Sequence, residues 1–179
     1  MEVRIFCEGE ADREFLVGFL NHLKKEGLNI DNPLSFIEVK KTKSKLLDKN
    51  SYKFDKLKKI KKALFLVDCD FERDDKRCGG CENSRRCLEE LIEEFAKRGI
   101  ECDYFLFDNN LEAFLLSTVD NNSKICFEDL KSCLELEEKA KHQKALICIY
   151  KGLYPKSPFD FSHPNFDELK KKIFWLFKE

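Results

Sequence analysis

Two aspartates separated by one residue, Asp68 and Asp70, come where a run of five apolar residues ends. The run, residues 63–67, is typical of a strand that is buried on both faces of a parallel sheet. Side chains two positions apart on an extended segment point the same way, so these two carboxylates can converge on one cation. An all-oxygen site of this kind suits Mg²⁺. The alternative is an acidic loop that solvates the end of the strand.

Three more carboxylates follow other predicted strands. Glu8 lies at the tip of the first strand, Asp12 in the first turn of the helix after it, and Glu112 in the first turn of a helix after the fourth strand. Ligands of open α/β sheets bind at the carboxyl ends of the strands, so we expect these acids near the two aspartates. Asp12 also fits an ordinary role at a helix N-terminus, which is worth about 0.3–1 kcal/mol.

The elements that must position these acids alternate along the chain. The expected strands cover residues 3–7, 34–39, 63–67 and 102–107. The first expected helix follows the first strand and ends near residue 25. Further helices are expected over residues 53–62, 83–98, 127–141 and 165–177. The apolar run 145–150 fits either a helix or a strand. This alternation predicts an α/β fold with a mostly parallel, four-stranded central sheet flanked by helices.

Length and composition predict a single domain over residues 1–179, with a core of about residues 1–120 and a helical C-terminal extension of about residues 121–179. The chain is 42% hydrophobic, which is enough for a real core. No apolar stretch approaches the roughly 20 residues of a membrane span. The first residues lack the pattern of a signal peptide, so we expect a cytoplasmic protein without membrane contact. The oligomeric state is left open.

The net charge of −1 gives no case for nucleic-acid binding by the chain as a whole. Its distribution is uneven, however, because residues 40–62 contain eleven lysines against two acids. Such a segment is either a solvated loop and helix face or a surface that follows phosphates.

The chain has nine cysteines, an odd number, and in a cytoplasmic protein we expect thiols rather than a disulfide scaffold. Four of them lie in or beside apolar runs and are expected as small core residues: Cys7, Cys69, Cys126 and Cys148. Cys78, Cys81 and Cys87 form a different group, because C-x2-C spacing with glycines suits a structural Zn²⁺ site. A fourth ligand would have to come from Cys102 or Cys133 through the fold, and the alternative is a loop of free thiols.

Four motifs in this order resemble the Toprim (topoisomerase–primase) domain. The first two are Glu-Gly-x-x-Asp at residues 8–12 and Asp-x-Asp at 68–70, each at a strand end. The third is a segment after the fourth strand, and the fourth is a pair of segments in the C-terminal part of the chain. Leu-Glu-Ala-Phe-Leu at 111–115 is similar to the Leu-Glu-x-x-Leu segment of the OLD-nuclease branch. The segments 138–142 and 173–177 are similar to small stand-alone Toprim proteins related to OLD nucleases, whose function is uncertain. The resemblance spans nearly the whole chain and implies a Toprim-like three-layer fold.

The resemblance also implies roles for the residues of the site. The implied ligands of two Mg²⁺ or Mn²⁺ ions are Glu8, Asp12, Asp68, Asp70 and Glu112. Glu8 would also handle the proton of the nucleophile or leaving group. Lys141 would neutralise charge in the transition state, with Lys139 as the second choice. The implied activity is metal-dependent cleavage of phosphodiesters in nucleic acid.

Other readings of the same residues stay open. OLD nucleases carry an ATPase domain, and this chain has no Gly-x-x-x-x-Gly-Lys-Ser/Thr loop, so an ATPase partner would act in trans. A non-catalytic, metal-binding module of the same fold that binds nucleic acid or protein is the main alternative. Phosphatases of the haloacid dehalogenase type also end a strand with Asp-x-Asp, but theirs is the first strand of the domain, whereas here it is the third.

Overall fold

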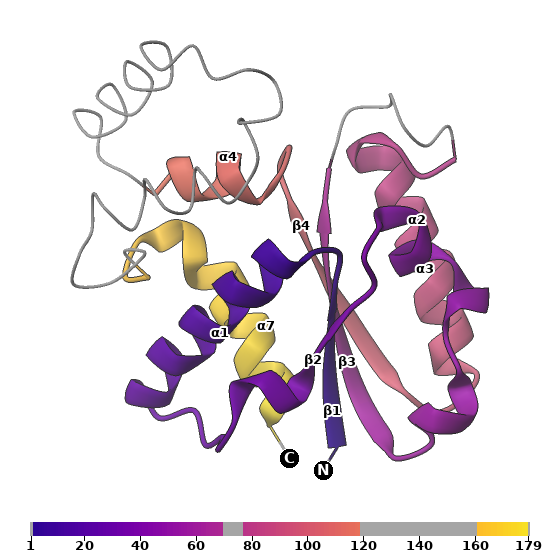
Figure 1. The fold of residues 1–179 in the computed structure, drawn as a ribbon, viewed down its shortest axis with the longest axis horizontal. Helices are drawn as coiled ribbons and strands as arrows, with labels where there is room; N and C mark the ends of the chain where they lie inside the picture. Colours follow the sequence, from indigo (N-terminus) through magenta and orange to yellow (C-terminus); the bar gives the residue numbers. More distant parts are fainter. Residues whose placement is uncertain (1, 70–76, 119–160, 179) are drawn as a thin grey trace.

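A sheet of four parallel strands in the order β2-β1-β3-β4 organises the computed structural model, which describes residues 2–69, 77–118 and 161–178. The strands are β1 (Glu2–Cys7), β2 (Ile37–Val39), β3 (Ile60–Asp68) and β4 (Glu101–Phe107). Parallel strands need crossover connections, and here helices provide them on both faces of the sheet (Figure 1). The predicted α/β class with a parallel, helix-flanked sheet is confirmed.

The helices form one layer on each face of the sheet, and a short helix lies at its carboxyl end (Figure 1). α1 (Glu10–Lys25) and α7 (Asp167–Phe177) cover one face, and α2 (Lys43–Leu47) and α3 (Gly80–Ala96) cover the other. α4 (Leu111–Leu116) follows β4 directly. The carboxyl ends of all four strands therefore point toward the turns that begin α1, α2, α3 and α4.

β3 is the central strand of this arrangement, because it pairs with both β1 and β4. Its side chains alternate between two apolar clusters. Leu64 and Leu66 pack toward α1 and α7, whereas Phe65 and Val67 pack toward α3. All four are at most 1% exposed. The strand buried on both faces that the sequence predicts is present, and it extends from residue 60 to residue 68.

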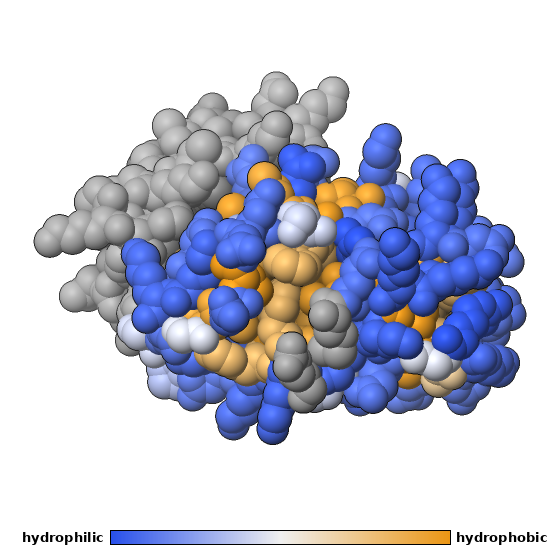
Figure 2. All heavy atoms as spheres, turned by 90° about the horizontal axis from the view of Figure 1, so that it is seen from below, coloured by the Kyte–Doolittle hydropathy of each residue, from blue (hydrophilic) through white to orange (hydrophobic). Residues whose placement is uncertain are grey.

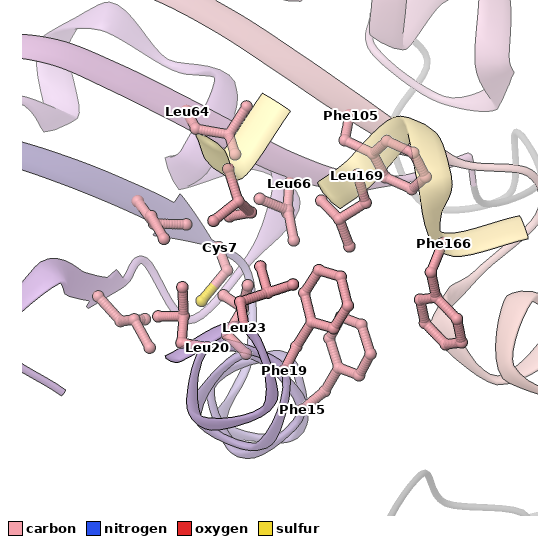
Figure 3. Packing of buried hydrophobic residues seen from close by; sticks show 14 of the residues in the cluster. Cys7, Phe15, Phe19, Leu20, Leu23, Leu64, Leu66, Phe105, Phe166 and Leu169 are labelled. Carbon is pink, nitrogen blue, oxygen red and sulfur yellow. The ribbon is translucent and has the colours of Figure 1, made fainter. Parts of the chain in front are cut away.

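Aromatic rings fill both clusters. In the first, Phe15 and Phe19 of α1 face Leu66 of β3 and Phe166 near the start of α7 (Figure 3). In the second, the Phe95 ring of α3 lies 5.1 Å from the ring of Tyr52, 5.1 Å from that of Phe54 and 5.3 Å from that of Phe65. Edge-to-face contacts of this kind add to the stabilisation that area burial provides.

Two expected elements differ from the structure. The helix expected over 53–62 is wrong: a 3-10 turn, η3 (Phe54–Leu57), stands there, and β3 begins at Ile60. Apolar residues at every third position fit a 3-10 turn as well as an α-helix, and crowded lysines disfavour the longer helix. The strand expected over 34–39 is half wrong, since its first part is the 3-10 turn η1 (Pro33–Phe36), which Asn32 caps.

The other expected helices fall differently. The helices expected up to residue 25, over 83–98 and over 165–177 are confirmed with small shifts of their ends. The segments 127–141 and 145–150 lie outside the described residues. Within the described ranges, no helix combines the length and the apolar content needed to cross a membrane. Seen from below, at the amino ends of the strands, the surface is mostly hydrophilic, with apolar residues showing between polar side chains (Figure 2).

The Phe95 cluster predicts a large loss of stability on truncation. Phe95→Ala removes a ring that is 0% exposed and is expected to lower the free energy of unfolding by about 3–5 kcal/mol. Leu34→Ala is the control, because Leu34 is 54% exposed and its truncation should cost no more than about 0.5 kcal/mol. Urea unfolding followed by circular dichroism measures both, and equal losses would contradict the assignment of the core.

Candidate functional site

The loop between β1 and α1 carries the first two predicted acids. β1 ends at Cys7, and the chain turns through Glu8 and Gly9 before α1 begins at Glu10. The Asp12 carboxylate accepts a hydrogen bond of 2.8 Å from the Gly9 N–H, so it caps α1, as the simpler interpretation of this residue expects. Its side chain is nevertheless buried, with 4% exposure, whereas Glu8 is half-buried.

Asp68 is the last residue of β3 and is 7% exposed. Its Oδ1 accepts a hydrogen bond of 3.1 Å from the Leu111 N–H, at the start of α4. Asn110 caps the same helix by accepting the Ala113 N–H at 2.9 Å. The residue after Leu111 is Glu112, whose backbone therefore lies in the first turn of a helix that is tied to Asp68. This hydrogen bond joins residues 43 positions apart, so it brings the end of β3 next to the start of α4.

The sheet register brings the remaining loop to the same edge. β1 and β3 are adjacent and parallel, and Phe6 pairs with Phe65. Glu8 leaves β1 two residues after Phe6, at the height at which β3 reaches Val67 and Asp68. Neighbouring strands lie about 4.8 Å apart, so the loop with Glu8 adjoins the end of β3. The predicted convergence of acid-bearing loops at one edge of the sheet is present for the described residues.

The Cys7 thiol, at the end of β1, is buried close to several acids of this edge. Burial raises the pKa of its thiol strongly, and the charges of Asp12, Glu10 and Glu8 raise it further, against a smaller opposing effect of Arg13. The thiol therefore stays protonated at neutral pH. A thiolate beside these acids would add a negative charge where several are already held.

Two predicted site residues, Asp70 and Lys141, lie outside the described residues, as does Lys139. Among residues 2–69, 77–118 and 161–178, no three or more His, Cys, Asp or Glu side chains are grouped so that they could hold a metal ion. The described part of the chain thus places the ends of β1 and β3 and the start of α4 at the same edge of the sheet. A complete set of ligands is not formed by these residues alone.

Sequence reasoning did not single out Lys43. It begins α2 and shares a buried face of that helix with Leu46 and Leu47. Lys43 is 8% exposed, and its Nζ has no hydrogen-bond partner in the described structure. Three residues earlier, the Lys40 N–H donates to the carbonyl of Cys7, the residue before Glu8. The signal for Lys43 was its spacing of three and four residues from two apolar positions in a lysine-rich segment.

Other lysines of the 40–62 segment have structural roles. Lys40 forms an ion pair of 2.7 Å with Glu38, and its ammonium lies 3.9 Å from the centroid of the Tyr52 ring. Lys62 donates to the carbonyl of Lys178 at 2.6 Å and so ties the end of α7 to β3. The segment is therefore more than a solvated face.

The cysteines differ from the expected thiols. Disulfides join Cys69 to Cys81 and Cys78 to Cys87, with Cα–Cα distances of 4.5 and 6.0 Å. Cys69 is thus a bridging residue rather than a simple core residue. Cys7 is buried as expected, and among the described cysteines neither Cys7 nor Cys102 forms a disulfide. Burial, with a smaller effect of Asp103, raises the pKa of Cys102 to about 12.

Comparison of the chain with protein-family models, with curated proteins and with solved structures found no match.

The bond between Asp68 and Leu111 predicts different effects of two substitutions. Asp68→Ala leaves a buried N–H without its acceptor and is expected to lower the free energy of unfolding by about 1–3 kcal/mol. Asp68→Asn keeps an oxygen acceptor at the same place and removes a buried charge, so it should cost less. Chemical unfolding of both variants without divalent metal ions measures the difference. Equal losses would show that this hydrogen bond contributes nothing to stability.

Proposed function

We propose that this protein is a metal-dependent, nuclease-type phosphodiesterase of the Toprim superfamily that acts on nucleic acid. The observation that carries the proposal is the burial of two carboxylates at one edge of the sheet: Asp68 ends β3, and Asp12 lies in the first turn of the helix that follows the adjacent strand β1. Buried carboxylates are costly unless cations or hydrogen bonds compensate them. Each accepts a hydrogen bond from a backbone N–H, and carboxylate oxygens are the ligands that hard divalent cations prefer.

The donors suit Mg²⁺ or Mn²⁺ in kind. Glu8, Asp12 and Asp68 offer only carboxylate oxygens, the ligands that hard divalent cations prefer. Such ions, when bound, polarise a phosphate and lower the pKa of a bound water. Asp70 and Glu112 complete the proposed ligand set.

The residues have separate roles in this proposal. Asp68 positions the start of α4 through its hydrogen bond with the Leu111 N–H, and Glu112 is the next residue of that helix. Asp12 fixes the Gly9 turn and so orients Glu8. Glu8 is half-buried at the tip of β1 and is the residue that moves a proton to or from the reacting oxygens. Lys141 neutralises charge that develops on the phosphate, with Lys139 as the second choice.

Lys43 is a further phosphate contact in this proposal. An ammonium group that is buried without a partner among the described residues is costly, and an anionic ligand at the same edge of the sheet would offset that cost. The chain places α2 at this edge, because Lys40 is still bonded to the carboxyl end of β1. A lysine contact with phosphate adds affinity without sequence preference.

The second candidate function is a non-catalytic subunit with the same fold that binds metal and either nucleic acid or protein. The capping role of Asp12 favours it, since this acid has a structural use without any metal. Under either function the ATPase that OLD nucleases carry would be a partner in trans. We also place the protein in the cytoplasm.

Metal-dependent cleavage tests the main proposal. Wild-type protein should cleave plasmid or oligonucleotide substrates with Mg²⁺ or Mn²⁺ and not with a chelator. Glu8→Gln and Asp68→Asn should each lower the rate by about 100-fold or more, because one loses proton transfer and the other a ligand charge. Glu10→Gln is the matched control, since Glu10 lies in the same loop region but is exposed and paired with Arg13.

The same variants separate the two functions. Metal binding to the folded state raises the melting temperature, and saturation at 100 times Kd is worth about 2.7 kcal/mol. Stabilisation by Mg²⁺ in the wild type but not in Asp68→Asn, without cleavage, would support the binding subunit. Neither stabilisation nor cleavage would reject both functions.

Lys43 gives an independent prediction. Lys43→Met should weaken nucleic-acid binding and reduce the slope of log affinity against log salt concentration by about 1. Lys45→Met is the matched control, because Lys45 lies on the exposed face of the same short helix. Fluorescence anisotropy at several salt concentrations measures both slopes. A stabilised Lys43→Met protein with an unchanged slope would mean that the buried charge does not contact phosphate.

A further inference from the structure

The four bridging cysteines surround one turn of the chain. Cys69 follows the last residue of β3, Cys78 and Cys81 flank the first residue of α3, and Cys87 lies two turns into that helix. The two disulfides are interleaved: the first cysteine pairs with the third, and the second with the fourth. Because Cys78 and Cys81 are three residues apart in the same turn, the two bonds belong to one local cluster.

This turn is held in shape by polar contacts other than the disulfides. The fully buried hydroxyl of Ser84 lies 2.9 Å from the Cys78 carbonyl and 2.7 Å from the Gly80 carbonyl. Asn83 donates to the Gly79 carbonyl at 2.9 Å. Gly80 has φ = 76°, a left-handed conformation that side chains disfavour. These contacts therefore stabilise the C-x2-C turn in addition to the disulfides.

As disulfides these cysteines form no metal site, but opening both bonds would free four thiols, the ligand number of a structural zinc centre. Zn²⁺ binds four cysteines in a tetrahedron with Zn–S distances of about 2.3 Å, which places the sulfur atoms about 3.8 Å apart. Within the two bonded pairs the Cα atoms lie 4.5 and 6.0 Å apart, so the sulfur atoms of each pair can reach that spacing by side-chain rotation. The exposed Arg77, Arg85 and Arg86 lie close in sequence, and α3 begins here, so the surroundings favour thiolates.

We propose that Cys69, Cys78, Cys81 and Cys87 bind one Zn²⁺ when they are reduced, and that the two disulfides are the oxidised, metal-free state of the same centre. Cys102, a ligand considered from sequence, is too far away. It pairs with Ala63 near the start of β3, whereas Cys69 lies six residues further along the chain, a distance of about 20 Å for an extended strand. Cys69 takes its place as the fourth ligand.

The redox step balances as follows. A phosphine reductant opens each disulfide, taking one oxygen atom from water to become its oxide and leaving two thiols. Zn²⁺ then displaces the four thiol protons. In the reverse direction, four thiolates give up four electrons, two molecules of hydrogen peroxide accept them with four protons to form four waters, and Zn²⁺ leaves. Disulfides open in reducing compartments, which is where the zinc form would prevail.

Metal titration of the full-length, phosphine-reduced protein without oxygen tests this proposal. Co²⁺ should bind one per chain with the absorption of a tetrahedral thiolate site, and Zn²⁺ should displace it. Cys69→Ser and Cys87→Ser should each weaken binding by at least 100-fold. Cys102→Ser is the control and should bind like the wild type. No thiolate absorption, or loss of binding in Cys102→Ser with retention in Cys69→Ser, would overturn the proposal.

A second measurement needs no variant and therefore does not depend on the folding of mutants. Zinc loaded into the reduced wild type should protect these four cysteines, and no others in the described ranges, from alkylation, as read by peptide mass spectrometry. Peroxide should then release one Zn²⁺ per chain and produce peptides linked 69–81 and 78–87. Alkylation that is unchanged by zinc would reject the site. This result is independent of nuclease activity, so either proposal can fail alone.

Discussion

Burial of β3 between two aromatic clusters is the constraint on which the other elements depend. The strand has neighbours on both sides and helices on both faces, so its register sets the height of β1 and β4 and hence of the loops that follow them. A slip by one residue would move Leu64 and Leu66 into the cluster of Phe65 and Val67. The acids at the end of the sheet are therefore positioned by apolar packing that lies well below them.

The site is built from backbone contacts at the edge of this sheet. The Asp12 carboxylate accepts a hydrogen bond from the Gly9 N–H, and the Asp68 carboxylate accepts one from the Leu111 N–H, which is distant in sequence. Each acid thus shapes the loop in which another acid lies, Glu8 in one case and Glu112 in the other. Stability and the proposed chemistry draw on the same carboxylates, so a substitution at either position changes both. The comparison of Asn with Ala variants separates these two contributions.

Sequence periodicity was sufficient for the larger elements and insufficient for the short ones. The five apolar residues before Asp68 and the helical spacing in α1 each have one stable arrangement, so both were predicted correctly. Phe54, Leu57 and Ile60 fit two periods, and their 3-10 turn depends on Phe95 of α3, a contact that local sequence cannot reveal. The same holds for the site: the loops that carry acids were predictable, whereas the burial of Lys43 and the pairing of Cys69 with Cys81 depend on tertiary packing.

A hydrogen bond joins the end of α4 to the residues that precede α7, and it affects the cost of changing the length of the chain between them. The Asn165 side chain donates to the Ser117 hydroxyl at 2.7 Å, so residues on either side of the segment 119–160 are fastened together. The entropic cost of closing a loop grows only with the logarithm of its length. Because residues 117 and 165 are held together in this way, inserting or removing residues between them should change the cost of closing the loop only slightly.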